Sequence, residues 1–330
     1  MRVLFFGTPE FAVPSLTALV GEGFDVVGVV TRPDKPTGRH RSTVVPSPVK
    51  RAALAEDLPV FEPERPSSDE FIAQARALEP DIAVVVAYGH ILKTALLDVP
   101  RLGSWNVHAS MLPKLRGAAP IERAILEGHT ETGVSIMRMD AGMDTGPVLH
   151  VARTPIPDGA TGGELRLHLA ELGALALIEA LVLLDESSAR PVAQNEADAS
   201  YAPKLTRDEE RIDWSQPAAM IARKIRAFDP APGAWTSAGG KSVKLFGPRV
   251  LDGDGRRQTA DGREDEVGEA AVRRLPSAVP GTVLAAGDQL RIACGSGAVE
   301  VCDVQPAGKG RMTVKSFVNG RGVAVGDVLS

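Results

Sequence analysis

The sequence predicts an α/β protein in which a doubly wound parallel sheet is followed by a small β-barrel. In the first half of the chain, short continuous apolar runs alternate with helical stretches, a pattern typical of parallel strands buried on both faces. After about residue 205, short strands separated by Gly and Pro follow one another, which is typical of a small barrel. The length of 330 residues favours two domains.

The first domain opens with a βαβ unit, in which strands at 1–7 and 25–31 flank a helix at 11–19. Thr8-Pro9 before this helix suits an N-cap followed by proline in the first turn. Because right-handed crossovers join parallel strands, the sheet is expected to be doubly wound. Its remaining expected elements are strands at 82–87 and 104–108 and helices at 69–78 and 163–184.

The second domain is expected to start after a polar segment of little periodicity. We expect the first domain at 1–189, a linker at 190–205 and the second domain at 206–330. The stretch 251–280 is charged and rich in Gly, so it is expected to be a flexible insertion. The other expected elements are a helix at 217–228 and strands at 241–246, 281–285, 290–293 and 298–303.

Composition and charge exclude several classes of protein. With 44% hydrophobic and 24% charged residues, the chain is not expected to be disordered. The net charge of -5 argues against coating nucleic acid, although residues 207–330 carry 18 basic against 16 acidic residues. The N-terminus has no signal-peptide core or membrane span, so a cytoplasmic protein is expected. Cys294 and Cys302 lie in strand-like sequence and are expected to be small apolar residues, in neither a zinc site nor a disulfide.

A long irregular segment at 32–50 contains four prolines and a cluster of basic residues, including Arg39 and Arg41. A loop of this length within a compact domain is usually functional or disordered. Basic residues on such a loop suit contact with a phosphate backbone, and a solvated surface insertion is the alternative.

The stretch NVHASMLP places Asn106, His108 and Ser110 on alternate residues at the end of an expected buried strand. In an extended chain, alternate side chains project from the same face. The carboxyl ends of strands in open α/β sheets are where ligands bind. A same-face amide and imidazole there indicate a catalytic site, whereas a lone His on a strand would more often be structural.

The stretch MDAGMDTGPV joins two apolar runs through two aspartates and two glycines. Turn chemistry is sufficient to explain Asp140. Asp144 is the better functional candidate, because a carboxylate beside an imidazole would hold its tautomer and favour its charged form. The sequence contains no GxGxxG, Walker loop, GxSxG or HExxH, so neither a dinucleotide site nor a metal site is indicated.

NVHASMLPKLRGAAPI (106–121) and ETGVSIMRMDAGMDTGPVL (131–149) resemble the formyltransferase superfamily that uses 10-formyltetrahydrofolate. Several further motifs are similar to the superfamily members that act on methionyl-tRNA: FFGTPEFAVPSL, the basic loop, YAPKL, RIDWS, IRAFDPAPGAW and QPAGKGRM. The resemblance covers nearly the whole chain except 251–280. It implies a Rossmann-like doubly wound sheet followed by a small C-terminal OB-like β-barrel that binds tRNA.

The resemblance implies that the enzyme transfers a formyl group from 10-formyltetrahydrofolate to the amino group of methionine on initiator tRNA. It assigns catalysis to Asn106, His108 and Asp144. Asn106 and His108 are placed to donate hydrogen bonds to the developing oxyanion. Asp144 either orients and charges His108 or takes the amine proton through a water, and both alternatives stay open.

The resemblance also implies two sets of binding residues. The expected folate-binding residues are Ser110, Met111, Leu112, Pro113, Val86, Tyr88, Asp140 and Gly142. The expected tRNA-binding residues are Arg39, Arg41, Lys204, Lys309 and Arg311. We expect no metal, no membrane partner and a monomeric enzyme.

Three rival functions differ in the sequence features that they require. A formyltransferase acting on an amino sugar nucleotide or on glycinamide ribonucleotide would share the trio but not the basic loop and C-terminal motifs. A non-catalytic RNA-binding or folate-binding protein would not need the intact trio. A nicotinamide-dependent oxidoreductase would need the missing GxGxxG.

Overall fold

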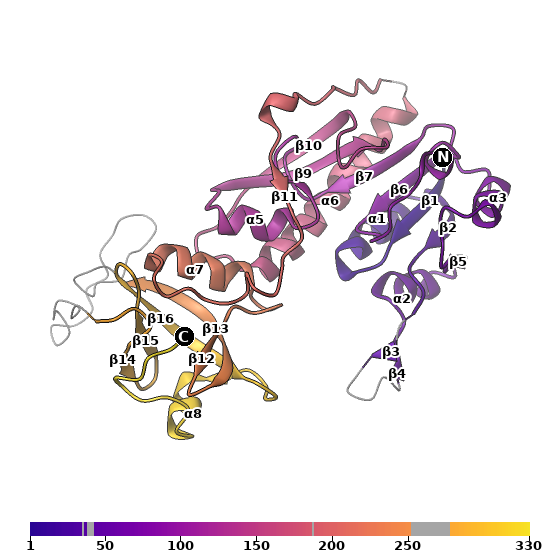
Figure 1. Cartoon of the computed structure of the whole chain (residues 1–330). Coiled ribbons are helices and arrows are strands. Elements are labelled where there is room, and N and C mark those ends of the chain that lie inside the picture. Colours follow the sequence, from indigo (N-terminus) through magenta and orange to yellow (C-terminus); the bar gives the residue numbers. More distant parts are fainter. Residues whose placement is uncertain (35, 38–42, 187, 252–277) are drawn as a thin grey trace. The chain divides into compact units, whose positions relative to one another are not determined.

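The structure of the protein is a computed structural model that describes residues 1–34, 36, 37, 43–186, 188–251 and 278–330 (Figure 1). These residues form two compact units. The first unit contains residues 1–120, 131–155 and 166–203, and the second contains residues 121–130, 156–165 and 204–330. Arg39, Arg41 and most of the expected insertion at 251–280 lie outside the described residues. The linear domain boundaries given above stay a prediction.

A seven-stranded sheet forms the centre of the first unit and confirms the predicted doubly wound α/β fold. Five strands are parallel, and two antiparallel strands extend the edge beyond β7. In spatial order the strands are β10 (Val148–Pro155), β9 (Glu131–Arg138), β7 (Ser104–His108), β6 (Ile82–Val86), β1 (Arg2–Gly7), β2 (Asp25–Val30) and β5 (Val60–Phe61).

Helices cover both faces of this sheet. Leu4, Phe6 and Val85 pack against α3 and α4 in one apolar cluster. On the opposite face, Gly173 of α6 lies close to Val107, and a Cβ at Gly173 would lie 2.9 Å from the Val107 side chain. The helices of the first unit are α1 (Val13–Gly21), α2 (Pro48–Ala55), α3 (Asp69–Ala77), α4 (Thr94–Leu97) and most of α6 (Gly162–Asp185), with 3-10 helices η1 (Glu10–Ala12) and η2 (Glu196–Asp198). Nearly all of α5 (Pro120–Leu126) belongs to the second unit.

The start of the first helix differs from the expected N-cap. The hydroxyl of Thr8 donates to the carbonyl of Tyr88 at 3.0 Å instead of capping the helix. Pro9 precedes the 3-10 turn η1, which has no side-chain cap. Thr8 therefore links the end of β1 to the segment after β6, a role that local sequence does not indicate.

Helix α6 is long and apolar enough to cross a membrane by length and composition alone. Its apolar side chains nevertheless include a fully buried face, with Leu169, Leu177 and Leu181 at most 1% exposed. The spacing of these residues repeats at helical periodicity, as expected for a helix that packs against a core.

The second unit contains an antiparallel curled sheet in the spatial order β12-β13-β16-β15-β14, with β17 paired to β16. Two of the described strands, β12 and β17, were not expected from the sequence. The elements are α7 (Ala218–Ala227), β12 (Trp235–Ala238), β13 (Lys241–Leu251), β14 (Val283–Ala286), β15 (Leu290–Ala293), β16 (Ala298–Pro306), β17 (Met312–Thr313) and α8 (Val314–Asn319). Cys294 and Cys302 are free thiols, and burial raises the pKa of Cys294 to about 12.

An ion pair within the second unit joins α5 to the segment before α7. Nη1 of Arg123 donates to Oε1 of Glu209 at 2.6 Å. The backbone N–H and hydroxyl of Thr206 both donate to Oε2 of Glu209 at 2.9 Å. The hydrogen bond from Arg123, followed by those from Thr206, lowers the pKa of Glu209 to about 2.

This pair predicts a pH-dependent contribution to stability. Because the pKa of Glu209 is lower in the folded state, its contribution is present above the unfolded value of 4.5 and is lost as the pH falls toward about 2. Glu209→Gln is therefore expected to reduce the free energy of unfolding at neutral pH but to have progressively less effect as the pH falls below 4.5. Urea denaturation of both proteins over this range measures the difference. A difference that does not change with pH would contradict the assignment.

Candidate active site

Strand β7 presents Asn106 and His108 from one face, as the alternation of the sequence predicts. Trp105 and Val107 point to the opposite face and are buried there. Asn106 lies beside Met137 of the neighbouring strand β9, and it remains partly exposed. The strand ends at His108, so both polar side chains lie at the carboxyl edge of the parallel sheet.

His108 is held by a backbone carbonyl that determines its tautomer. Its Nε2 lies 3.0 Å from the carbonyl oxygen of Leu115, and the imidazole is buried. A carbonyl oxygen can only accept a hydrogen bond, so Nε2 carries a proton. The other ring nitrogen, Nδ1, lies 3.7 Å from Oδ2 of Asp144.

Asp144 occupies the left-handed backbone region, with φ of +56°. Its Oδ2 accepts a hydrogen bond of 2.8 Å from the backbone N–H of Gly117, and its side chain is one-fifth exposed. Gly117 is itself at φ +116°, and a Cβ there would lie 2.8 Å from the carbonyl oxygen of Ala202. Glycine at position 117 therefore allows the backbone to approach both Asp144 and Ala202.

No hydrogen-bond donor of the described residues lies between Nδ1 of His108 and Asp144 when His108 is neutral. With Nε2 protonated, Nδ1 bears a lone pair that faces the Asp144 carboxylate. Two acceptors cannot bond to each other, so the gap suits a proton on Nδ1 or a donor group from a substrate. The pair can therefore accept a proton or stabilise a cation at the edge of the sheet.

The loop after β7 is held by two serines, of which only Ser110 was expected to be functional. The Ser110 hydroxyl donates to the carbonyl of Lys114 at 2.6 Å, and Ser110 is 1% exposed. Ser135 accepts from the N–H of Leu112 at 3.0 Å and donates to the carbonyl of Ser110 at 2.7 Å. Ser110 and Ser135 thus shape the loop that presents Met111, Leu112 and Pro113. The single polar residue within GVSIM was the only available signal for Ser135.

Val86 and Tyr88 have buried side chains, so contact with a ligand would come from the backbone of their segment. Both are at most 2% exposed, and the Tyr88 ring packs edge-on against Phe6 at 5.4 Å. Burial raises the pKa of Tyr88 to about 12. Within the part of the chain that the structure describes, the Tyr88 hydroxyl has no hydrogen-bond partner.

Asp140 and Gly142 lie in a turn, which is the structural role that the sequence indicated for Asp140. Oδ1 of Asp140 accepts from the N–H of Gly142 at 2.9 Å and from the hydroxyl of Thr145 at 2.8 Å. Asp140 therefore orders the loop that leads to Asp144. Met143, between the two aspartates, leaves more than half of its surface exposed.

The expected tRNA-binding residues of the second unit differ in their surroundings. Lys204 and Lys309 are exposed. Arg311 donates to Asp229 at 3.0 Å and to Asp303 at 3.1 Å, and its guanidinium lies 4.3 Å from the centre of the Phe246 ring. Its guanidinium is thus engaged within the unit, which leaves it less available for a phosphate than the two lysines.

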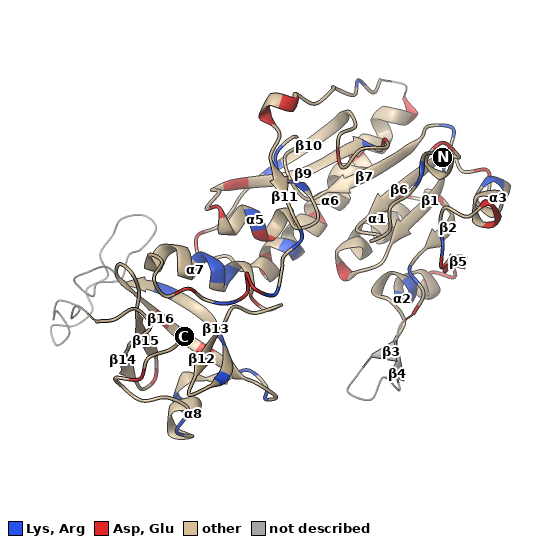
Figure 2. Ribbon diagram, in the orientation of Figure 1, with Lys and Arg blue, Asp and Glu red and all other residues tan. Residues whose placement is uncertain are grey.

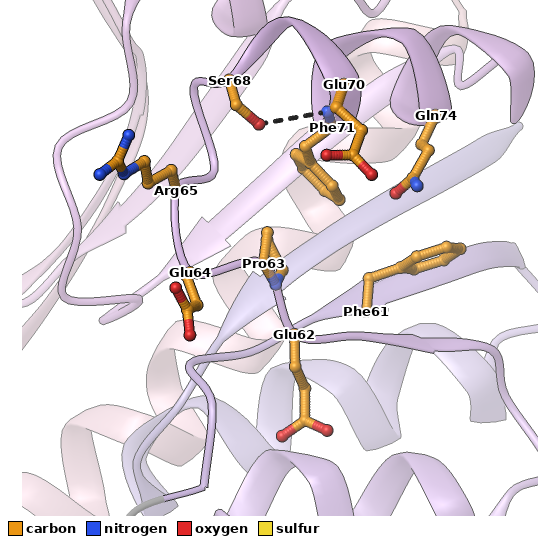
Figure 3. A pocket seen from close by; sticks show the side chains of 9 residues that line it. All are labelled: Phe61, Glu62, Pro63, Glu64, Arg65, Ser68, Glu70, Phe71 and Gln74. Atoms are coloured by element: carbon orange, nitrogen blue, oxygen red, sulfur yellow. Dashed lines mark hydrogen bonds between the residues drawn. The ribbon is translucent and has the colours of Figure 1, made fainter.

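A pocket of about 550 Å³ lies in the first unit away from the trio, between β5 and α3 (Figure 3). Its three glutamates and single arginine make it unsuited to an anionic ligand. None of the expected site residues is among those that line it: Phe61, Glu62, Pro63, Glu64, Arg65, Ser68, Glu70, Phe71 and Gln74. Among the described residues, no group of three or more His, Cys, Asp or Glu side chains is arranged to hold a metal ion.

Two families match the chain. Residues 1–181 match the family described as formyl transferase, and residues 204–322 match the formyl transferase C-terminal domain. The chain is 46% identical over 328 residues to the methionyl-tRNA formyltransferase of Symbiobacterium thermophilum, covering 99% of this chain and 94% of the relative. It is 45% identical over 327 residues to the methionyl-tRNA formyltransferase of Thiobacillus denitrificans, and this match covers 99% of this chain and 98% of the relative.

Solved structures share the fold. Methionyl-tRNA formyltransferase from Clostridium thermocellum is 14% identical with a TM-score of 0.55, covering 80% of this chain and 96% of that one. HypX from Aquifex aeolicus in complex with tetrahydrofolic acid is 19% identical with a TM-score of 0.62. This match covers 97% of this chain and 47% of HypX. The chain therefore spans about half the length of HypX.

The contact between Gly117 and Asp144 predicts the effect of a single added methyl group. Gly117→Ala would place a Cβ 2.8 Å from the Ala202 carbonyl and displace the N–H that binds Asp144. We expect the kcat of the formyl transfer that the sequence implies to fall about tenfold or more, because small displacements of catalytic groups are costly. Steady-state kinetics measures this effect.

Gly159→Ala is the matched control, because Gly159 also has a positive φ, of +83°, but has no atom within 4 Å of the added Cβ. The control bears the same kind of backbone strain without displacing a neighbour. Equal kcat values for the two variants would contradict a role of the Gly117 N–H in placing Asp144.

Proposed function

The chain belongs to the formyl transferase family, and we propose that it transfers a formyl group from 10-formyltetrahydrofolate to the amino group of methionine carried by initiator tRNA. Membership of the family confirms the resemblance seen in the sequence. The methionyl-tRNA acceptor is supported by relatives of that name that are 43–46% identical over nearly the whole chain. The observation that carries the proposal is the Asn106–His108–Asp144 arrangement at the carboxyl edge of the sheet.

The proposed reaction begins when the amine nitrogen attacks the formyl carbon and forms a C–N bond. Negative charge then develops on the formyl oxygen, so the site must supply hydrogen-bond donors. Asn106 supplies its side-chain amide. Because Nε2 of His108 is bonded to Leu115, the donor from His108 is Nδ1 of the protonated imidazole. The Asp144 carboxylate, 3.7 Å away, stabilises the positive charge of this imidazolium.

The second half of the reaction breaks the bond between the formyl carbon and N10 of the folate. N10 leaves as an amine after it receives a proton from the His108 imidazolium. The attacking nitrogen loses a proton to Asp144, directly or through a water. This proton then passes from Asp144 to Nδ1 of His108, 3.7 Å away, which restores both groups. The products are the formylated methionyl amine and tetrahydrofolate, so atoms and charges balance without a metal or redox group.

We propose that the co-substrate lies against the two loops that follow β7 and β9. The loop at 110–113 is shaped by Ser110 and Ser135, and the loop at 140–144 is ordered by Asp140. Met111, Leu112 and Pro113 supply apolar surface. The backbone of residues 86–88 supplies polar groups next to them, because the side chains of Val86 and Tyr88 are buried.

We propose that the second unit binds the tRNA through local clusters of basic residues, which a net charge of -5 permits. Helix α7 carries Arg223, Lys224 and Arg226 within four residues, and Figure 2 shows basic residues concentrated there. Lys224 and Arg226 also donate to the carbonyls of Arg211 and Ala160 within the unit, at 2.9 and 3.2 Å, so Arg223 is the member of this cluster that we propose contacts the tRNA. Exposed Lys204 and Lys309 add further positive charge. Arg39 and Arg41 complete the proposed set from the basic loop. We further propose that the enzyme is a cytoplasmic monomer.

The role of Asn106 predicts a loss of turnover. Asn106→Ala removes one oxyanion donor, so kcat is expected to fall by on the order of a hundredfold or more. Transfer of radiolabelled formyl from 10-formyltetrahydrofolate to Met-tRNA measures the effect, and thermal unfolding shows whether the variant is folded. Near wild-type turnover in a folded Asn106→Ala variant would remove Asn106 from the mechanism.

The acceptor is tested in the same assay with free methionine, an amino sugar nucleotide and glycinamide ribonucleotide as competitors. We expect label on Met-tRNA alone, and its loss in His108→Ala. Label on another acceptor, with none on Met-tRNA, would contradict the proposed substrate while leaving the family assignment intact.

A further inference from the structure

The segment at 190–203 forms extensive contacts with the residues that hold the trio. The β8 strand (Arg116–Gly117) pairs in parallel with β11 (Tyr201–Ala202). The hydroxyl of Ser200 accepts from the N–H of Leu115 at 2.9 Å, and its carbonyl accepts from the N–H of Arg116 at 2.9 Å. The segment expected to be a linker therefore stabilises the two backbone groups, at 115 and 117, that bind His108 and Asp144.

Gln194 is the side chain of this segment that bonds the Asp144 loop directly. Its Nε2 donates to the carbonyl oxygen of Asp144 at 2.8 Å and to that of Gly146 at 2.7 Å. Its Oε1 accepts from Nε and Nη2 of Arg116 at 3.1 and 2.9 Å. Carbonyls provide no donor and a guanidinium provides no acceptor, so the Gln194 amide can have only one orientation.

Arg116 anchors Gln194 from within the core. Its side chain is fully buried, and its guanidinium makes two hydrogen bonds to the carboxylate of Glu196, at 2.9 and 2.8 Å. The ion pair compensates the buried charge, and the pairing with Glu196 raises the pKa of Arg116. Arg116 directly precedes Gly117, so one short segment holds both the Asp144 carboxylate and the glutamine that binds the Asp144 carbonyl.

From these contacts we infer that Gln194, anchored by Arg116, is a positioning residue that directs the Asp144 carboxylate toward His108. Asp144 has a φ of +56°, a conformation that a non-glycine residue keeps only when surrounding contacts enforce it. The two hydrogen bonds from Gln194 hold the carbonyls on either side of Thr145 and so supply that constraint. This inference rests on the proposed catalytic role of Asp144.

Two substitutions of Gln194 test the role of its two N–H hydrogen-bond donors. Gln194→Glu keeps the shape and the acceptor for Arg116 but removes both N–H donors. Gln194→Met removes the donors without adding charge. For both variants we expect kcat to fall about tenfold or more while KM for Met-tRNA and for 10-formyltetrahydrofolate changes little, because the reacting groups are misplaced and the binding surfaces are not.

Asn195→Ala is the neighbouring control, since its side chain bonds only locally, to Asp198 and Ala197, in the contacts that the structure describes. It is expected to keep wild-type kcat. If Gln194→Glu and Gln194→Met also keep wild-type kcat, or if their loss appears in KM alone, the inference is overturned.

A double-mutant cycle with Asp144→Asn tests whether Gln194 acts through Asp144. If it does, adding Gln194→Glu to Asp144→Asn lowers kcat by much less than in the wild-type background. Independent, multiplicative losses would overturn the inference and leave the proposed function intact. Full activity of Asp144→Asn alone would overturn both.

Discussion

The backbone of residues 115–117 holds both His108 and Asp144, and the rest of the candidate site depends on it. The Leu115 carbonyl determines which nitrogen of His108 carries a proton. Two residues later, the Gly117 N–H binds the carboxylate that faces the other nitrogen. A single short segment, which includes β8, therefore holds both sides of the imidazole. Displacing this segment would alter both contacts at once, without any change in the side chains of His108 and Asp144.

The strand is stable in this position because two parts of the chain enclose it. Pairing of β8 with β11 supplies its backbone hydrogen bonds, and the close approach to Ala202 requires glycine at position 117. On the other side, the Asp144 loop is held through Gln194 and the buried Arg116. These hydrogen bonds hold the loop that carries Asp144 and the segment at 115–117 in one arrangement, which is the kind of preorganisation that a catalytic site needs.

The large sheet positions Asn106 and His108 at the candidate site. Burial of Trp105 and Val107 against the helical layer forces Asn106 and His108 to the opposite face at the carboxyl edge of β7. The polar residues are thereby held in place by an apolar core. Basic residues, in contrast, are concentrated on separate elements such as α7, so a net negative charge is compatible with local positive clusters.

The sequence by itself determined the fold class, the family and the face shared by Asn106 and His108. The fold class and the shared face follow from short-range patterns: apolar runs of strand length, helical periodicity between them, and the two-residue alternation of a strand. The family follows from the resemblance of motifs such as NVHASMLPKLRGAAPI. The structure confirms the doubly wound sheet for this reason. The sequence also indicated that Asp140 could be a turn residue, because its hydrogen bonds are to Gly142 and Thr145, a few positions away.

Only the tertiary structure decided what holds the site in place. Arg116 and Gln194 are 78 positions apart, and Gly117 and Asp144 are 27 apart. Ser135 is buried within an apolar strand. No local pattern relates residues at these separations, because their contacts arise from the packing of whole strands and loops. The polar stretch around Gln194 resembles a linker in composition, and only its hydrogen bonds to Arg116 and to the Asp144 loop in the folded chain make it part of the candidate site.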